Sequence, residues 1–219
     1  MKKNKHDVFK ENILLFFSKV FYMKKINFNK EKIVKILKQL EYVDSGANDH
    51  SSVENITAFS KTGKLLENQN FFNLKSIILK EFNFFKNNYL RYTKTNFKIT
   101  TSWVSKSIKN QSSNYHAHKN SFYSGIFYVQ TDADCGGISF ENFFNTNSIM
   151  IKPEDYNIYN SNEYKINIMD GLLLFFPSEI HHKILRNNSN IERYAISFNI
   201  MPVGEIGVGD SSLVIGKLT

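Results

Sequence analysis

The sequence predicts a mainly β fold in which N-terminal helices pack on the outside of a mostly antiparallel β-barrel. Apolar residues recur at helical spacing only before residue 96, and from Phe97 onward they alternate with polar residues. Short strand-like runs then continue to the end of the chain, separated by turn residues and not by helices, which is typical of a sandwich or barrel. A chain of 219 residues can bury its core as one domain. We therefore expect a single domain, with a helical elaboration over 1–95 and the barrel core over 96–219.

Two helices are predicted before the barrel. Asn29 is a suitable N-cap for the first, whose apolar face comprises Ile33, Ile36, Leu37 and Leu40. The segment 44–70 is rich in Ser, Asn, Asp and Gly, so we expect a long irregular connection there. The second helix is marked at three-to-four spacing by Leu74, Ile78, Phe82, Phe85 and Tyr89. An aromatic stripe of this kind is more often core than a cofactor site.

The expected strands follow in order. The first alternates between two faces, with Phe97, Ile99, Thr101 and Trp103 on one of them. The others are expected at 124–130, 137–140, 164–168, 172–176, 182–185 and 194–200.

Composition narrows the class of partner. The chain has 28 Lys+Arg against 20 Asp+Glu, a net charge of +8, but the excess is almost all lysine at solvent-facing spacing. We interpret it as solvated surface and expect no nucleic-acid partner. The early apolar run ILLFFSKVF is interrupted by Lys19 and is too short for a bilayer span, so we expect no membrane partner either. The single Cys135 cannot form an intramolecular disulfide, which favours a reducing, cytoplasmic location.

Two pairs of histidines are candidate metal ligands. The stretch NYHAHKNSFYSGIFYV places His116 and His118 two apart, and in a strand both would project from one face. His181 and His182 follow much later, and because adjacent strand residues face opposite ways only one of them can join the first pair. Three converging imidazoles would suit Zn, Cu, Fe or Ni. The alternative for both pairs is a position on a solvent-facing turn, which is the commoner fate of an isolated HxH.

Arginine is scarce in this chain, and Arg193 stands at the start of RYAISFN. In a strand Arg193, Ala195, Ser197 and Asn199 share one face. A guanidinium can hold a carboxylate through two parallel hydrogen bonds, as lysine cannot. If this face lines the barrel interior, a buried carboxylate ligand is implied. The alternative is an exposed arginine at a strand start.

Taken in order, HxH followed by SGxxY, then GLLLFFPSxxxH, then RxxISFN resembles a group of 2-oxoglutarate- and Fe(II)-dependent oxygenases. The resemblance implies a double-stranded β-helix, a jelly-roll or cupin-like barrel. It implies iron ligation by His116 and by His182, which the FPSxxxH motif selects over His181. Arg193 would bind the distal carboxylate of 2-oxoglutarate, and Tyr128 would hydrogen-bond to it or else serve as a core aromatic.

The activity that the resemblance implies is a dioxygenase reaction using Fe(II), 2-oxoglutarate and O2. Decarboxylation of 2-oxoglutarate to succinate and CO2 would accompany oxidation of a substrate, usually its hydroxylation. The motifs specify neither the substrate nor the oligomeric state. We expect the segments 142–162 and 44–70 to border the barrel mouth and to select the substrate.

One departure concerns the ligand set, because most of the wider superfamily places Asp or Glu where this chain has His118. His118 is then an iron ligand, an outer contact or a substrate contact, and Glu141 or Asp132 is a candidate for a missing carboxylate. Two other functions remain open. One is a three-histidine, cupin-like dioxygenase without 2-oxoglutarate, in which Arg193 would bind substrate directly. The other is a non-catalytic β-barrel binding module.

Overall fold

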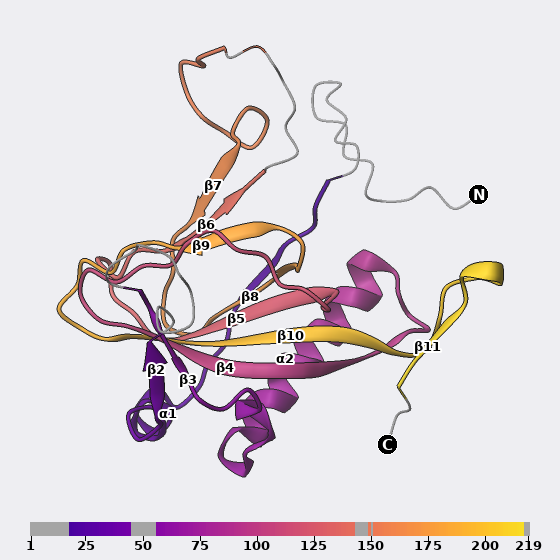
Figure 1. The fold of residues 1–219 in the computed structure, drawn as a ribbon, viewed down its shortest axis with the longest axis horizontal. Helices are drawn as coiled ribbons and strands as arrows, with labels where there is room; N and C mark the ends of the chain where they lie inside the picture. Colours follow the sequence, from indigo (N-terminus) through magenta and orange to yellow (C-terminus); the bar gives the residue numbers. More distant parts are fainter. Residues whose placement is uncertain (1–17, 45–55, 143–148, 150, 217–219) are drawn as a thin grey trace.

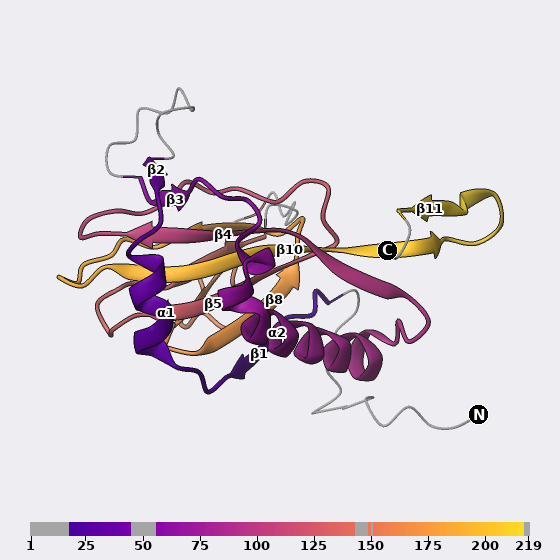
Figure 2. The same ribbon diagram turned by 90° about the horizontal axis from the view of Figure 1, so that it is seen from below.

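The structure is a computed structural model that describes residues 18–44, 56–142, 149 and 151–216. Two antiparallel sheets and two α-helices make up most of it (Figure 1). The helices cover the outer face of the larger sheet, as Figure 2 shows from below. This is the predicted arrangement, a double-stranded β-helix with helices packed outside.

The larger sheet has eight strands in the order β1-β8-β5-β10-β4-β3-β2, with β11 pairing to the far end of β10. Every strand pair in it is antiparallel. Its strands are β1 (Tyr22–Lys25), β2 (Tyr42–Asp44), β3 (Ala58–Ser60), β4 (Asn96–Ser107), β5 (Tyr123–Gln130), β8 (Leu172–Pro177), β10 (Arg193–Ile206) and β11 (Leu213–Ile215).

The smaller sheet lies across the larger one and has three antiparallel strands in the order β7-β6-β9. Its strands are β6 (Ile138–Glu141), β7 (Glu163–Ile166) and β9 (His181–Ile184). All the strands predicted from the sequence are present, but β10 continues to Ile206, six residues beyond its predicted end at Ile200. The short strands β1, β2, β3 and β11 were not predicted.

The two faces of the larger sheet bury different cores, and strand alternation explains how. In β5, Phe127 and Val129 point toward the helices, whereas Ile126 and Tyr128 point into the space between the sheets. Almost every residue of β5 is therefore buried, and β8 is buried along its whole length. Such strands lack a polar face because neither side meets water.

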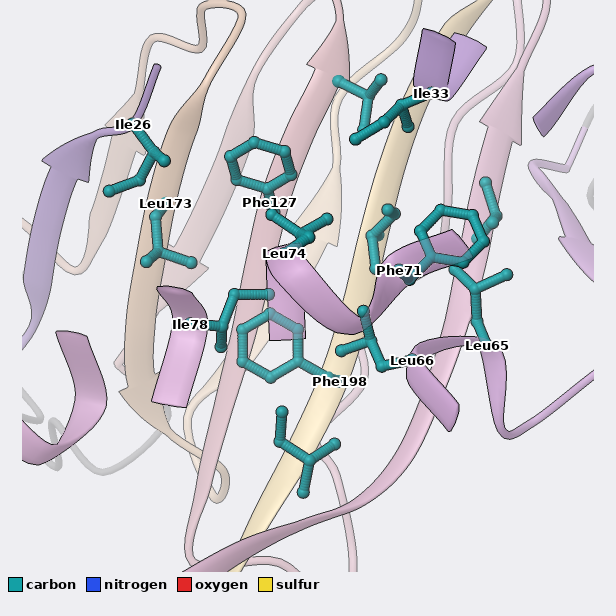
Figure 3. Packing of buried hydrophobic residues seen from close by; sticks show 14 of the residues in the cluster. Ile26, Ile33, Leu65, Leu66, Phe71, Leu74, Ile78, Phe127, Leu173 and Phe198 are labelled. Atoms are coloured by element: carbon teal, nitrogen blue, oxygen red, sulfur yellow. The ribbon is translucent and has the colours of Figure 1, made fainter. Parts of the chain in front are cut away.

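The helices are α1 (Lys30–Leu37) and α2 (Phe72–Phe85). Asn29 caps α1 as predicted, its side chain accepting a hydrogen bond from the Lys32 backbone N–H at 3.0 Å. The predicted apolar stripe of α2 is core, since Leu74, Ile78 and Phe82 are each at most 4% exposed. Leu74 and Ile78 meet Phe127 and Phe198 from the sheet in the packed layer of Figure 3.

Two predictions about the N-terminal part need correction. Tyr89 is 55% exposed, because α2 ends at Phe85 and a π-helical turn, Lys86–Leu90, rotates the chain away from the helical stripe. The described part of the 44–70 connection is not irregular throughout. It contains β3, which pairs with β4, and two short 3-10 helices, Leu65–Glu67 and Gln69–Phe71.

Together these elements form a barrel whose interior lies between the two sheets. Neither helix in the described part of the chain has the length and apolar character needed to cross a membrane.

Candidate functional site

Three histidines converge between the two sheets. His116 and His118 lie on the segment that leads into β5, and His182 lies on β9. The segment is tied to β9 because the backbone N–H of His116 donates to the carbonyl of His182 at 3.0 Å, and the reverse bond is 2.9 Å. The ring centroids are 4.4 to 5.5 Å apart, and one nitrogen from each ring lies within 4.8 Å of the others.

The hydrogen bonds of these rings fix which nitrogen is free. Nδ1 of His116 lies 2.9 Å from the carbonyl oxygen of Asn114, and Nδ1 of His182 lies 3.0 Å from that of Ile180. Nδ1 of His118 lies 2.6 Å from the side-chain oxygen of Asn199. Each oxygen can only accept, so each Nδ1 carries the proton and each Nε2 keeps its lone pair. Three Nε2 atoms with free lone pairs, one from each ring, are the donor set that a metal ion requires.

Burial keeps these rings neutral. Desolvation lowers the pKa of His118 to about 4 and that of His182 well below its usual value, and it also lowers the pKa of His116. A neutral imidazole is the form that ligates a metal. The residues present therefore fit a divalent ion of the kind that imidazole favours.

The other candidate ligands lie elsewhere. His181 pairs with Glu141 across β9 and β6, whereas His182 pairs with Phe140, so alternation places His181 and Glu141 on the opposite face. The carboxylate of Asp132 accepts a hydrogen bond from the Ser189 hydroxyl. Within the described residues only the three histidines form a cluster with metal-ligand spacing, so neither Glu141 nor Asp132 completes it.

Arg193 lies on the interior face of β10 and is 2% exposed. Its guanidinium donates to the carbonyl oxygens of Cys135 and Leu185 and to the hydroxyl of Ser107. Those contacts use three of its five N–H groups. Among the described residues no carboxylate forms an ion pair with it, and burial lowers the pKa of the group. A buried cation without an anion is costly, which marks a position suited to an anionic ligand.

Tyr128 lies opposite Ala195, beside Arg193 on the same interior surface. It is 4% exposed, burial raises its pKa, and its hydroxyl has no hydrogen-bond partner within the described chain. The side chain is therefore both a core aromatic and a free donor close to Arg193.

The pocket around the histidines has uncharged walls. The pocket around the three imidazoles is completed by Phe59, Trp103, Ser105, Ile126, Ile184 and Ser197. Trp103 is the closest aromatic neighbour on β4, with its ring centroid 5.5 Å from that of His118. Among the described residues that line this pocket, only the histidines are titratable.

The structure thus brings together His116, His118 and His182, and separately Arg193 and Tyr128. Sequence reasoning placed Asn199 on the face of Arg193 but missed its contact with His118. The RxxISFN motif carries Asn199 on that face, but the contact itself depends on how β10 lies against the segment before β5.

The matching family model, described as "Putative 2OG-Fe(II) oxygenase", covers residues 101–199. That range contains all five candidate site residues. No curated protein sequence matches this chain.

Solved structures share the fold at low sequence identity. A prolyl hydroxylase from Trichoplax adhaerens, in complex with a hypoxia inducible factor peptide fragment, superposes with a TM-score of 0.56 at 14% identity, covering 82% of each chain. HygX from Streptomyces hygroscopicus, with nickel, 2-oxoglutarate and hygromycin B bound, gives 0.54 at 11% identity and 82% of each chain. A Pseudomonas putida prolyl-4-hydroxylase gives 0.51 at 12%, covering 82% of this chain and 91% of that one.

The fold, the histidine cluster and the family model agree. Residues 101–199 match the 2OG-Fe(II) oxygenase family, whose members use Fe(II), 2-oxoglutarate and O2, and the fold and the histidine cluster of this chain support an oxygenase.

Proposed function

We propose that this oxygenase holds Fe(II) through His116, His118 and His182 and anchors 2-oxoglutarate through Arg193 and Tyr128. It would oxidise a substrate, in the simplest case by hydroxylation, with release of succinate and CO2. The observation that carries the cosubstrate assignment is the buried guanidinium of Arg193, which has no carboxylate partner among the described residues.

The metal assignment is supported by the tautomers of the three rings. All three Nδ1 atoms lie against oxygen acceptors, which leaves three Nε2 lone pairs for one ion. A metal–nitrogen bond is about 2.1 Å, so a small inward shift of the rings would close a site whose ligand atoms now lie within 4.8 Å of one another.

The anchor is supported by the free donors beside Arg193. Two guanidinium N–H groups and the Tyr128 hydroxyl can together donate to both oxygens of a carboxylate. In the absence of water, such charge-assisted bonds are strong. A neighbour of the same fold, HygX, has nickel and 2-oxoglutarate bound.

Each part of this chain then has a defined task. The histidines orient the ion and Arg193 orients the far end of the cosubstrate, while the uncharged pocket wall excludes water from the space between them. Iron supplies the activation of O2, which no side chain here can perform.

The three-histidine dioxygenase without 2-oxoglutarate remains the nearest competing function, since no carboxylate joins the ligand cluster within the described residues. In that function the buried guanidinium of Arg193 would bind an unidentified substrate directly. The free Cys135 thiol, buried in the core, is consistent with our expectation of a cytoplasmic location.

The test is anaerobic titration of the Fe(II)-loaded protein with 2-oxoglutarate. Chelation of iron by 2-oxoglutarate gives a weak visible charge-transfer band, and admission of O2 should then yield succinate slowly even without substrate. His182→Ala should abolish both signals. Iron binding without the band or succinate would refute the 2-oxoglutarate assignment and favour the three-histidine alternative.

A further inference from the structure

Two side chains lie against Nδ1 of His118, the amide oxygen of Asn199 at 2.6 Å and the Ser124 hydroxyl at 2.8 Å, and of the two only the amide oxygen cannot donate a proton. Asn199 lies on β10, between Thr101 of β4 and Ser124 of β5, just before the register of the β10–β4 pair shifts. Its side-chain oxygen accepts from Nδ1 of His118 at 2.6 Å and from the Ser124 hydroxyl at 2.9 Å.

The orientation of the Asn199 amide is held from the other side. Its side-chain NH2 donates to the Thr101 hydroxyl at 3.0 Å while its oxygen faces His118. If the amide were turned over, the NH2 group would face Nδ1 of His118. The proton would then sit on Nε2, and the ring could not bind a metal through that atom.

The other two histidines are held differently. His116 and His182 each use the backbone carbonyl two residues earlier, which no substitution removes. His118 alone depends on side chains, those of Asn199 and Ser124. It is also the residue that occupies the place where the wider superfamily has a carboxylate.

Behind Asn199 the contact continues as a line of buried hydroxyls. Ser124 lies 2.9 Å from Ser178, and Ser178 lies 2.9 Å from Ser121. Ser124 and Ser178 are fully buried, so this line holds the Ser124 hydroxyl against the Asn199 oxygen. The hydrogen bonds of the Asn199 side chain are therefore all made to neutral groups.

We propose that Asn199 is a positioning residue that keeps His118 in the Nδ1–H form, with Nε2 free for the ion. The inference rests on the proposed metal site. It predicts that Asn199→Leu, which removes the acceptor, weakens Ni(II) or Co(II) binding about 10- to 100-fold. Asn199→Asp keeps the acceptor and adds a charge, so it should tighten binding by about tenfold.

Two measurements separate positioning from general damage. Long-range ¹H–¹⁵N spectra of the metal-free protein report the tautomer of each histidine, and Asn199→Leu should shift His118 alone toward the Nε2–H form. In a His118→Ala background, Asn199→Leu should cause no further loss of metal affinity.

The outcomes are decisive in either direction. An unchanged His118 tautomer in Asn199→Leu, equal losses in both backgrounds, or weaker binding by Asn199→Asp would overturn the proposal. Should Asn199→Leu fail to fold, the near-isosteric Asn199→Asp still decides by the direction of its effect. The tautomer measurement uses no metal, so a wild-type protein that bound none would contradict the proposed function and leave this inference to be judged separately.

Discussion

Trp103 lies beside His118, with ring centroids 5.5 Å apart and the planes inclined by 52°. It is the only tryptophan in the chain. Tryptophan emission therefore comes from one side chain, and that side chain contacts a candidate metal ligand.

Binding of Co(II) or Ni(II) should therefore quench tryptophan fluorescence, because the open-shell ion would sit within contact range of the Trp103 ring. The measurement is a fluorescence titration of the metal-free protein, reversed by EDTA. Zn(II), which has a closed shell, serves as the control and should compete without comparable quenching. Tight binding of Ni(II) with no change in emission would place the ion elsewhere.

Replacement of His182 should weaken metal binding far more than replacement of its neighbour. His182 is 2% exposed and belongs to the ligand cluster, whereas His181 faces the other side of β9. Removing a residue that hydrogen-bonds to a metal ligand typically lowers metal affinity about 10- to 100-fold, and removing the ligand itself should lower it at least as much. In the titration above, His182→Ala should lose at least that much affinity and His181→Ala almost none. Equal losses would mean that the ligand is misassigned.

Arg193→Lys should weaken 2-oxoglutarate binding while metal binding survives. Lysine keeps the positive charge but loses the planar fork, so we expect a cost of roughly 1.5 to 3 kcal/mol in cosubstrate affinity. Isothermal titration of the Zn(II)-loaded protein measures it. Arg186→Lys is the matched control, because Arg186 is exposed and should show wild-type affinity. Identical affinities in all three proteins would remove Arg193 as the anchor.

The metal-free protein should lose stability as the pH falls from about 6.5 to about 4. Burial lowers the pKa of His118 to about 4, whereas in the unfolded chain it is near 6.5, so between these values only the unfolded chain binds the proton. Each such histidine steepens the loss by up to about 1.4 kcal/mol per pH unit. Urea unfolding in EDTA at pH 7 and pH 5 measures this. His118→Asn should flatten the dependence, and an unchanged slope would show that the ring is not buried neutral.

Phe82→Ala should destabilise the fold by about 3 to 5 kcal/mol, because the ring is 1% exposed and packs between α2 and the sheet. Phe84→Ala, on the exposed side of the same helix, should cost much less. Chemical denaturation of both variants tests this. Similar small losses would mean that α2 does not cover the barrel.

The long strands and the second helix could be predicted because each buries one face along its whole length. The spacing of apolar residues within the segment therefore shows which element it forms. The strand β3 could not, since Ala58–Ser60 is too short to show a period and becomes a strand only by pairing with β4. For the same reason β1 was missed. Tyr22–Lys25 is exposed along most of its length and is ordered by β8.

Some of the candidate site residues could likewise be predicted from the sequence, and others could not. Same-face spacing brought His116 and His118 together, and the scarcity of arginine pointed to Arg193. The role of Asn199 depends on the register between β10 and the segment before β5, which no local pattern encodes. The choice of His182 over His181 needed the resemblance, because alternation alone allows either.

β10 connects the two ends of the site from Arg193 to Asn199, paired with β4 throughout and with β5 from Tyr194, with one register shift toward β5 between Tyr194 and Ala195. Such a strand rises about 3.3 Å per residue, and it cannot lengthen without breaking its hydrogen bonds to both neighbouring strands. The strand would therefore hold a fixed distance between the proposed carboxylate anchor and the histidine cluster. A 2-oxo diacid one methylene shorter or longer than 2-oxoglutarate would reach only one end of it, so selectivity for chain length should belong to the backbone and persist in variants that alter the pocket walls.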